Sequence, residues 1–179
     1  METLFLACAL LLTPHQTRLW HLDFTSLSQP IQWQVINDGV MGGRSLSRVS
    51  YNDDGLLFEG TLSLENNGGF ASTRAPINIR IPTNATITIR VKGDGRQYQL
   101  RFRPDGNRWG IAYAAQFESS DQWQTVTLTP GDFNVVYRGR RVIGAPPIEQ
   151  VEMGTLGWML ADKQPGPFSL TIASISLSE

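Results

Sequence analysis

Residues 86–103 read TITIRVKGDGRQYQLRFR, and this stretch predicts the fold class of the whole chain. Each half alternates apolar and polar side chains with a period of two, as expected for a strand with one buried face. The alternating apolar residues are Ile87, Ile89 and Val91 in the first half and Tyr98, Leu100 and Phe102 in the second. The Gly-Asp-Gly between the halves is a turn signal, so a β-hairpin is expected here.

Short runs of the same kind recur along the rest of the chain, at residues 56–64, 69–75, 77–81, 123–128 and 167–177. Pro76 is expected to end a strand, and a break in the alternation near Ala173 predicts a β-bulge. A short helical turn is expected at 147–153, where Pro-Pro opens the segment. No long stretch shows helical periodicity. The pattern therefore predicts an all-β sandwich or barrel.

The composition bounds the class of protein. The chain has 179 residues, 41% of them hydrophobic, which suits one globular domain with a substantial core. The formal net charge of −1 argues against broad electrostatic capture of nucleic acid. Cys8 is the single cysteine, which excludes an internal disulfide framework and fits a reducing compartment such as the cytoplasm.

The N-terminal residues have a different character. Residues 4–12 (LFLACALLL) have the length of a signal-peptide apolar region and are too short to span a membrane. Glu2 precedes them without Lys or Arg, and no small-x-small cleavage site follows. We expect 1–18 to be an extension and 19–179 to be one domain, with export by a short signal as the alternative. No other segment is apolar enough to cross a bilayer.

Catalytic motifs are missing from the sequence. The histidines are His15 and His21, and neither lies in a nucleophile or metal motif. Carboxylates for a glycosidase pair exist, but their spacing selects no pair; the candidates are Asp38, Glu59, Glu65, Asp121 and Asp162. We therefore expect no enzyme and no cofactor. Asp38, Asp53 and Asp54 are oxygen donors that could suit a structural Ca²⁺, although Asp-Asp-Gly is more often a turn, so no metal site is predicted.

Two glycine clusters, NDGVMGG at 37–43 and NNGGF at 66–70, interrupt the strands. One interpretation is that both are elaborate turns, since Gly and Asn commonly mark turns. The other is that both loops meet at one rim of the sandwich and form a binding site, where glycine lets a partner approach the backbone. Spacing alone favours the first interpretation.

Arginines and tryptophans supply further candidates. Guanidinium groups suit carboxylates, phosphates or sugar hydroxyls, and they equally form ordinary surface ion pairs; the group is Arg44, Arg74, Arg138, Arg140 and Arg141. Indole rings can stack on a sugar but more often pack in the core of a sandwich; the rings in question are Trp33, Trp109, Trp123 and Trp158.

Four blocks together resemble the complex I intermediate-associated protein 30 family: 33–45, 57–74, 133–140 and 156–170. They read WQVINDGVMGGRS, LFEGTLSLENNGGFASTR, FNVVYRGR and LGWMLADKQPGPFSL, in the order that the family shows. The resemblance extends from about residue 19 to the end. It implies a galactose-binding-like jelly-roll β-sandwich, a fold that many carbohydrate-binding modules also use.

The resemblance also implies a function. The family's mitochondrial namesake is an assembly factor that binds intermediates of respiratory complex I and performs no reaction. Related plant domains are fused to a dehydrogenase-like region, whereas no dinucleotide motif occurs here. The family pattern covers Trp33, Asn37, Asp38, Met41, Gly42, Gly43 and Ser45, then Asn66, Asn67, Gly68, Gly69, Phe70, Ser72 and Arg74, and finally Arg138, Gly139, Arg140, Asp162, Lys163, Gly166 and Phe168.

The leading hypothesis is a non-catalytic binding module that acts as an assembly or scaffolding factor. Its partner would be a protein, with intermediates of a respiratory or another membrane complex as candidates, and not a nucleic acid. The predicted surface consists of Asn37, Asp38, Gly42, Gly43, Asn66, Asn67, Gly68, Gly69, Arg74, Arg138 and Arg140. The alternative is a carbohydrate-binding module with a glycan ligand.

Overall fold

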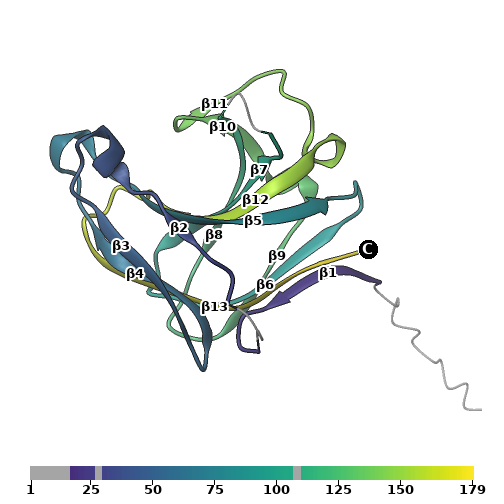
Figure 1. The fold of residues 1–179 in the computed structure, drawn as a ribbon, viewed down its shortest axis with the longest axis horizontal. Coiled ribbons are helices and arrows are strands. Elements are labelled where there is room, and N and C mark those ends of the chain that lie inside the picture. The colour runs from purple at the N-terminus through teal and green to yellow at the C-terminus, as the bar shows by residue number, and fades with distance from the viewer. Residues whose placement is uncertain (1–16, 27–29, 107–109) are drawn as a thin grey trace, which may run out of the picture.

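The computed structural model describes residues 17–26, 30–106 and 110–179. Across these residues the strands form a six-stranded and a seven-stranded sheet, packed face to face (Figure 1). Every strand pair is antiparallel. None of the described helices is long and apolar enough to span a membrane. The all-β sandwich predicted from the alternating strands is confirmed.

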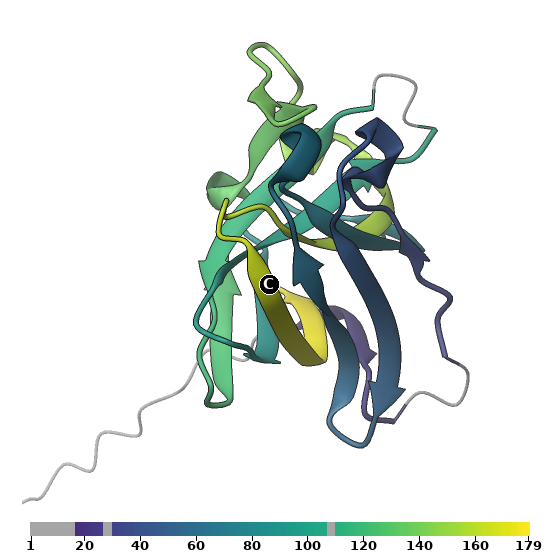
Figure 2. The same cartoon turned by 90° about the vertical axis from the view of Figure 1, so that its left-hand side faces the viewer.

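The first sheet has β13 at its centre. Its strand order is β3 (Leu46–Asn52), β4 (Gly55–Leu62), β13 (Gly166–Ser178), β6 (Thr86–Lys92) and β9 (Gln124–Leu128). β1 (Arg18–Asp23) also pairs with β13, beyond the part that pairs with β4. In the view turned by 90°, β3 and β4, drawn in blue, lie beside the yellow β13 (Figure 2).

The second sheet runs from β11 (Arg140–Arg141) through β10 (Asn134–Tyr137), β8 (Ala112–Glu118), β7 (Gln97–Pro104), β12 (Glu152–Leu160) and β5 (Ala71–Arg80) to β2 (Gln34–Val35). Short 3-10 turns connect the strands: η1 (Asp38–Met41), η2 (Glu65–Asn67), η3 (Pro130–Asp132) and η4 (Ile148–Gln150). η4 lies within the helical turn expected at 147–153.

The core lies between the two sheets and is built from the inward members of each alternating strand. Phe168 of the first sheet meets Tyr98 of the second with ring centroids 6.5 Å apart, and it meets Phe58 at 5.1 Å. Burying one such side chain contributes about 1.5–3 kcal/mol, so the period-two pattern selects the inward face of each strand.

The hairpin expected at 86–103 is wrong. β6 and β7 are indeed strands, but β6 pairs with β13 and β9, whereas β7 pairs with β8 and β12. The Gly-Asp-Gly segment therefore carries the chain from one sheet to the other. Asp94 closes this arch by accepting hydrogen bonds from the Tyr98 hydroxyl at 3.1 Å and from the Ser169 amide at 2.9 Å. The apolar faces of β6 and β7 then meet across the core.

Two expectations about strand ends have different outcomes. Pro76 does not end a strand, because β5 continues from Ala71 to Arg80. On one side of β5, among the described residues, β2 pairs only with Thr73 and Arg74. On the other side, the pairing with β12 shifts register beside Pro76. The missing amide hydrogen of proline therefore breaks no regular pairing there. The bulge predicted near Ala173 is confirmed by a register shift between Ile172 and Ser174.

Candidate functional site

The two glycine-rich loops meet around the carboxylate of Asp38, which is completely buried. Oδ1 accepts a hydrogen bond from the Ser45 amide at 2.9 Å, and Oδ2 accepts from the Gly69 amide at 2.7 Å and the Phe70 amide at 3.3 Å. The Ser45 hydroxyl also donates to Oδ2. Burial by itself would raise the pKa of Asp38, but these hydrogen bonds favour the charged form, and the pKa is lowered overall.

Glycine in these loops is explained by close packing against that carboxylate. A Cβ atom on Gly43 would lie 2.4 Å from Cγ of Asp38, and one on Gly68 would lie 2.6 Å from its Oδ2. The Asn66 side-chain amide adds a direct link, donating to the Gly42 carbonyl at 3.1 Å. The two loops therefore meet as predicted. Glycine is required at positions 43 and 68 because a side chain there would collide with Asp38, and not because a partner approaches the backbone.

The rim outside this buried carboxylate is apolar and exposed. Val40 is 74% exposed and Met41 64%, both in η1, and Leu46 at the start of β3 is 72% exposed. Leu64, just before η2, is exposed as well. We call these four side chains the loop rim. The family pattern includes Met41, but Val40, Leu46 and Leu64 were not predicted, because an isolated apolar residue near a turn carries no motif. η1 and η2 appear as neighbouring blue turns at the upper left of Figure 1.

Arg74 lies on the outer face of β5. Its guanidinium donates to the side-chain oxygen of Gln34 on β2 from Nε at 3.1 Å and from Nη2 at 3.0 Å. Asn37, which precedes η1, accepts a hydrogen bond from the Ser47 hydroxyl at 2.7 Å, so its side chain joins the loop to β3. Asn66 and Asn67 are exposed and have the positive φ values of 55° and 59° that asparagine tolerates.

Arg138 and Arg140 lie apart from the other predicted residues. Arg138 lies in the turn after β10, and Arg140 lies in β11, the edge strand of the seven-stranded sheet opposite to β2. Val136 of β10 pairs with Ala112 at the start of β8. The loop before β5 lies at the opposite end of the strands, because Ala71 at the start of β5 pairs with Leu160 at the end of β12. The guanidinium of Arg138 sits 5.3 Å above the ring of Tyr137. One continuous surface therefore does not contain both sets.

Of the five carboxylates considered for a glycosidase pair, four have separate partners, whereas Asp121 is exposed. Asp38 is held as described, Glu59 pairs with Arg48 at 2.8 Å, and Glu65 pairs with Arg44 at 2.9 Å.

Asp162 forms a buried ion pair. Arg96 donates to Asp162 from Nε at 2.8 Å and from Nη2 at 2.7 Å, and to the Pro167 carbonyl at 2.9 Å. The side chains of Arg96 and Asp162 are only 11% and 5% exposed. Burial would raise the pKa of Asp162, but the hydrogen bonds from Arg96 and from the Gln164 amide lower it overall. This pair connects the β6–β7 arch to the segment between β12 and β13.

A shared calcium site for Asp38, Asp53 and Asp54 does not form. Asp38 bonds to Ser45, just before β3, whereas the two consecutive aspartates lie in the turn after Asn52, where β3 ends. Within the described residues, no group of three or more His, Cys, Asp or Glu side chains could hold a metal ion.

The described aromatic candidates are largely covered. Trp158 is completely buried in the core, and Trp33 is half-buried with Nε1 donating to the Tyr51 hydroxyl at 2.9 Å. The Arg90 guanidinium lies 5.3 Å above the ring of Trp123. Trp109, His15 and the apolar residues 4–12 lie outside the described residues. His21 is exposed on β1.

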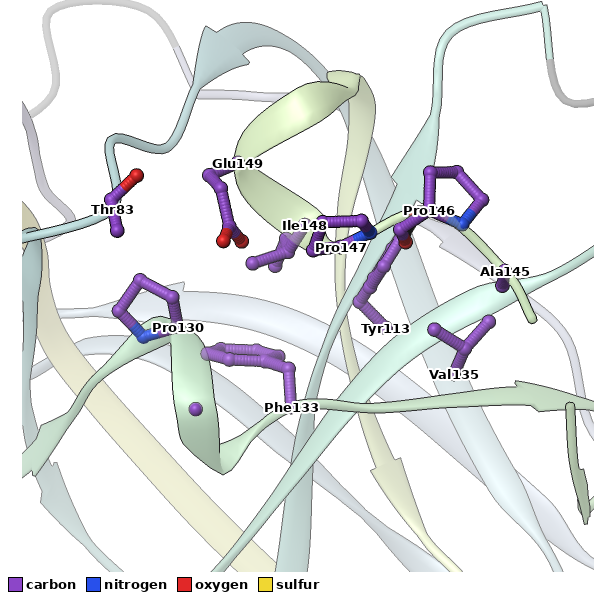
Figure 3. A pocket seen from close by; sticks show the side chains of 11 residues that line it. Thr83, Tyr113, Pro130, Phe133, Val135, Ala145, Pro146, Pro147, Ile148 and Glu149 are labelled. Atoms are coloured by element: carbon purple, nitrogen blue, oxygen red, sulfur yellow. Dashed lines mark hydrogen bonds between the residues drawn. The ribbon is translucent and has the colours of Figure 1, made fainter. Parts of the chain in front are cut away.

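A pocket of about 390 Å³ lies beside η3 and η4 and contains none of the predicted residues. Figure 3 shows Glu149 projecting between Thr83 and Ile148 above the ring of Phe133. The Tyr113 hydroxyl donates to the Pro146 carbonyl at 2.8 Å and is therefore already engaged. Glu149 is the sole carboxylate among the lining residues, so the pocket has no acid–base pair.

Solved structures of similar shape include carbohydrate-binding modules. The family 11 module of a cellulosomal cellulase from Clostridium thermocellum matches with a TM-score of 0.58 and 11% identity, covering 92% of this chain and 95% of that one. A family 30 module matches with a TM-score of 0.57 and 14% identity, covering 89% and 88%. At such identity the likeness concerns the fold alone, and it confirms the galactose-binding-like jelly-roll sandwich.

Sequence comparison gives a narrower relationship. Mouse mitochondrial complex I intermediate-associated protein 30 is 28% identical over 169 residues, which cover 82% of this chain and 52% of the mouse protein. The chain thus spans about half the length of this relative. The model of the family described as complex I intermediate-associated protein 30 (CIA30) matches residues 22–172. The chain therefore belongs to the CIA30 family.

Proposed function

We propose that this domain is a non-catalytic protein-binding module that serves as an assembly or scaffolding factor for a protein complex. Family membership supports a role of this kind, since the mouse relative is named for its association with an intermediate of complex I. The proposal includes complex I as a candidate client of this chain. It also includes the compartment of this chain, for which the sequence favours the cytoplasm, whereas the name of the mouse relative places that protein in mitochondria.

The observation that carries the proposal is the loop rim. Val40, Met41 and Leu46 are each more than 60% exposed, although large apolar side chains are normally buried. Their backbone is held by the buried hydrogen bonds to Asp38, so the loops present these side chains on a rigid support. Rigid exposed apolar groups favour protein association, because burying them in an interface removes apolar surface from water.

The state of the ionisable groups supports a non-catalytic role. Asp38, Arg96 and Asp162 use their polar atoms in internal hydrogen bonds, so they hold loops rather than face a substrate. A general acid or base needs a reachable proton partner in a cleft.

Glycan binding, the alternative ligand class, has weaker support. The similar solved structures include a family 11 module in complex with a mixed-linked tetrasaccharide, but its identity to this chain is 12%. Trp33 and Trp123 are half-buried and already in contact with Tyr51 and Arg90. A tryptophan-fluorescence titration with β-glucan and xylan oligosaccharides tests this ligand class, and we expect no change.

The proposed function is tested by replacing the loop rim in cells that produce the protein. Tagged wild type and the double variant Met41→Ser, Leu46→Ser are separated on native gels after crosslinking, and complexes are identified by mass spectrometry. We expect wild type to migrate with subunits of a larger complex and the double variant to migrate alone. Antibodies to complex I subunits show whether complex I is that client.

Ile143→Ser is the matched control, because Ile143 is 94% exposed but follows β11 at the other edge of the sheet. This variant should retain the large complex. Equal migration of wild type and the double variant would refute the loop rim as the docking surface.

A further inference from the structure

Three arginines share the outer face of the seven-stranded sheet. Arg74 lies on β5, and Arg101 and Arg103 lie on β7, where the intervening Leu100 and Phe102 point into the core. Since successive side chains of a strand alternate between faces, the arginines project away from the core. β5 and β7 are separated by β12 alone, as Figure 1 also shows.

The strand register places the three arginines on neighbouring positions of one outer face, on either side of β12. Gly157 pairs with Arg74 on one side and with Arg101 on the other, so their Cα atoms lie about 10 Å apart, two strand spacings. Gly157 has no side chain to separate them. Thr155, two residues earlier on β12, pairs with Arg103.

The three groups influence one another electrostatically. Burial lowers the pKa of Arg101 to about 10, and the positive charge of Arg103 contributes to this shift. Burial also lowers the pKa of Arg103, with a further contribution from the charge of Arg74. Burial is thus the main cause of both pKa shifts, and the neighbouring positive charges add to it.

The hydrogen-bond partners of this cluster are neutral. Arg74 bonds to the Gln34 amide oxygen, and Arg103 donates to the carbonyls of Gly110 at 3.1 Å and Ile111 at 3.2 Å. Nη1 of Arg101 donates to the sulfur of Met159 on β12. Within the part of the chain that the structure describes, the ion pairs involve other arginines: Arg44, Arg48, Arg80 and Arg96.

Two buried donors of the cluster have no partner at all among the described residues. These are Nε of Arg101 and the hydroxyl of Thr155. The contrast with Arg96 is informative, because that arginine is fully paired with Asp162. A buried donor without an acceptor costs about 1–3 kcal/mol, so unpaired donors beside uncompensated cations indicate a place for an external anion.

We propose that Arg74, Arg101, Arg103 and Thr155 form a binding site for carboxylate side chains of an acidic segment on the partner protein. The carboxylate would accept hydrogen bonds from the free donors and neutralise the clustered charge. Nucleic acid fits poorly, since its binding requires many phosphate contacts and the protein carries a net charge of −1. This inference deepens the proposed function and rests on it, because it names the chemistry of the protein partner.

The test is a direct titration of the purified full chain with a fluorescent octaglutamate peptide, followed by anisotropy. We expect saturable binding that weakens as salt is raised, because exposed parts of the ion pairs are screened. Arg101→Gln, Arg103→Gln and Arg74→Gln should each weaken binding about tenfold or more, as expected for loss of a charge-assisted hydrogen bond. Arg101→Lys should lose most of the affinity too, because lysine lacks the planar fork.

Arg80→Gln is the matched control, since Arg80 also lies on β5 but is exposed and paired with Glu152 at 2.9 Å. It should bind the peptide like wild type. Each variant is first shown to fold by its thermal transition, and Arg74→Gln, at the exposed side of the cluster, tests the site even if Arg101→Gln does not fold.

Lack of peptide binding, or equal weakening in Arg80→Gln, would overturn the proposal. Binding of polygalacturonate or of inorganic phosphate in preference to the peptide would overturn it as well. The outcome is separable from the proposed function: the peptide titration needs no client, whereas the native-gel experiment tests the loop rim. Peptide binding with an unchanged native-gel pattern would refute the loop rim and leave the arginine site standing.

Discussion

Asp38 is the residue that organises the predicted site, although its role differs from a surface contact. The carboxylate is removed from solvent and accepts hydrogen bonds from Ser45, Gly69 and Phe70. It therefore acts through the loops that it holds. Asparagine has a similar shape, but it replaces one acceptor with a donor and loses the charge that these bonds favour.

Asp38→Asn is expected to lower the free energy of unfolding by about 2–3 kcal/mol at neutral pH. The lowered pKa of Asp38 means that its charge stabilises the fold above the ordinary aspartate pKa, and that this contribution disappears as the pH falls through the lowered value. Urea unfolding at pH 7 and pH 3 measures the effect. A difference between the two proteins that stays constant with pH would contradict this account.

Gly43→Ala tests the packing around the same carboxylate. The new Cβ would lie 2.4 Å from Cγ of Asp38, so the loop must move, and we expect a loss of about 1–3 kcal/mol in urea unfolding. Gly39→Ala is the control, because its Cβ would meet nothing within 4 Å; its effect should stay within about 0.5 kcal/mol. Equal losses would show that loop conformation, and not contact with Asp38, requires glycine.

At the scale of elements, the arch between β6 and β7 decides the topology. The bidentate bonds between Arg96 and Asp162 hold the segment after this arch against the segment that leads into β13. Asp94, bonded to Ser169, adds a second connection between the same elements. Two sheets are thus joined at one end by side chains as well as by the chain itself.

Asp162→Asn should destabilise the protein by about 3 kcal/mol, because it leaves the Arg96 charge buried without a counter-charge. Glu59→Gln removes a pair at the surface instead, in which the Arg48 side chain is 77% and the Glu59 side chain 27% exposed, and should cost about 0.5 kcal/mol. Thermal unfolding of both variants measures the difference. Similar melting temperatures for the two would mean that the buried pair contributes no more than a surface pair.

At the scale of the whole molecule, the sandwich separates stability from recognition. The core lies between the sheets, whereas the loop rim lies at one end and the arginine cluster lies on an outer face. Changes in one surface should therefore leave the fold and the other surface intact, since sites without shared partners behave additively.

Val40→Ser combined with Met41→Ser is expected to change the free energy of unfolding by less than about 0.5 kcal/mol, because both side chains are already exposed. The same double variant should bind octaglutamate like wild type. Urea unfolding and the anisotropy titration give the two readouts. A large loss of stability would show that these side chains pack within the domain and are not displayed for a partner.

Much of the fold was predictable because it depends on local patterns. The alternation at 86–103 identifies which residues are buried, as does that at 56–64 up to Leu62, and the break near Ala173 identifies the bulge. Leu64 continues the pattern but is exposed, because β4 ends at Leu62. Family membership could likewise be inferred from short blocks of sequence, such as the residues around Asp38. The alternation of buried and exposed residues depends only on neighbouring positions in the sequence, so these features could be predicted without knowing which strands pair.

Strand pairing, by contrast, is a long-range property that only the tertiary structure decided. A turn at Gly93–Gly95 serves a hairpin or a crossing between sheets equally well, and the choice depended on distant strands such as β13. The same physics separated Arg138 and Arg140 from the glycine loops and gathered Arg74, Arg101 and Arg103 across β12. Local sequence determines which way a side chain faces, but its neighbours on that face come from strands far away along the chain.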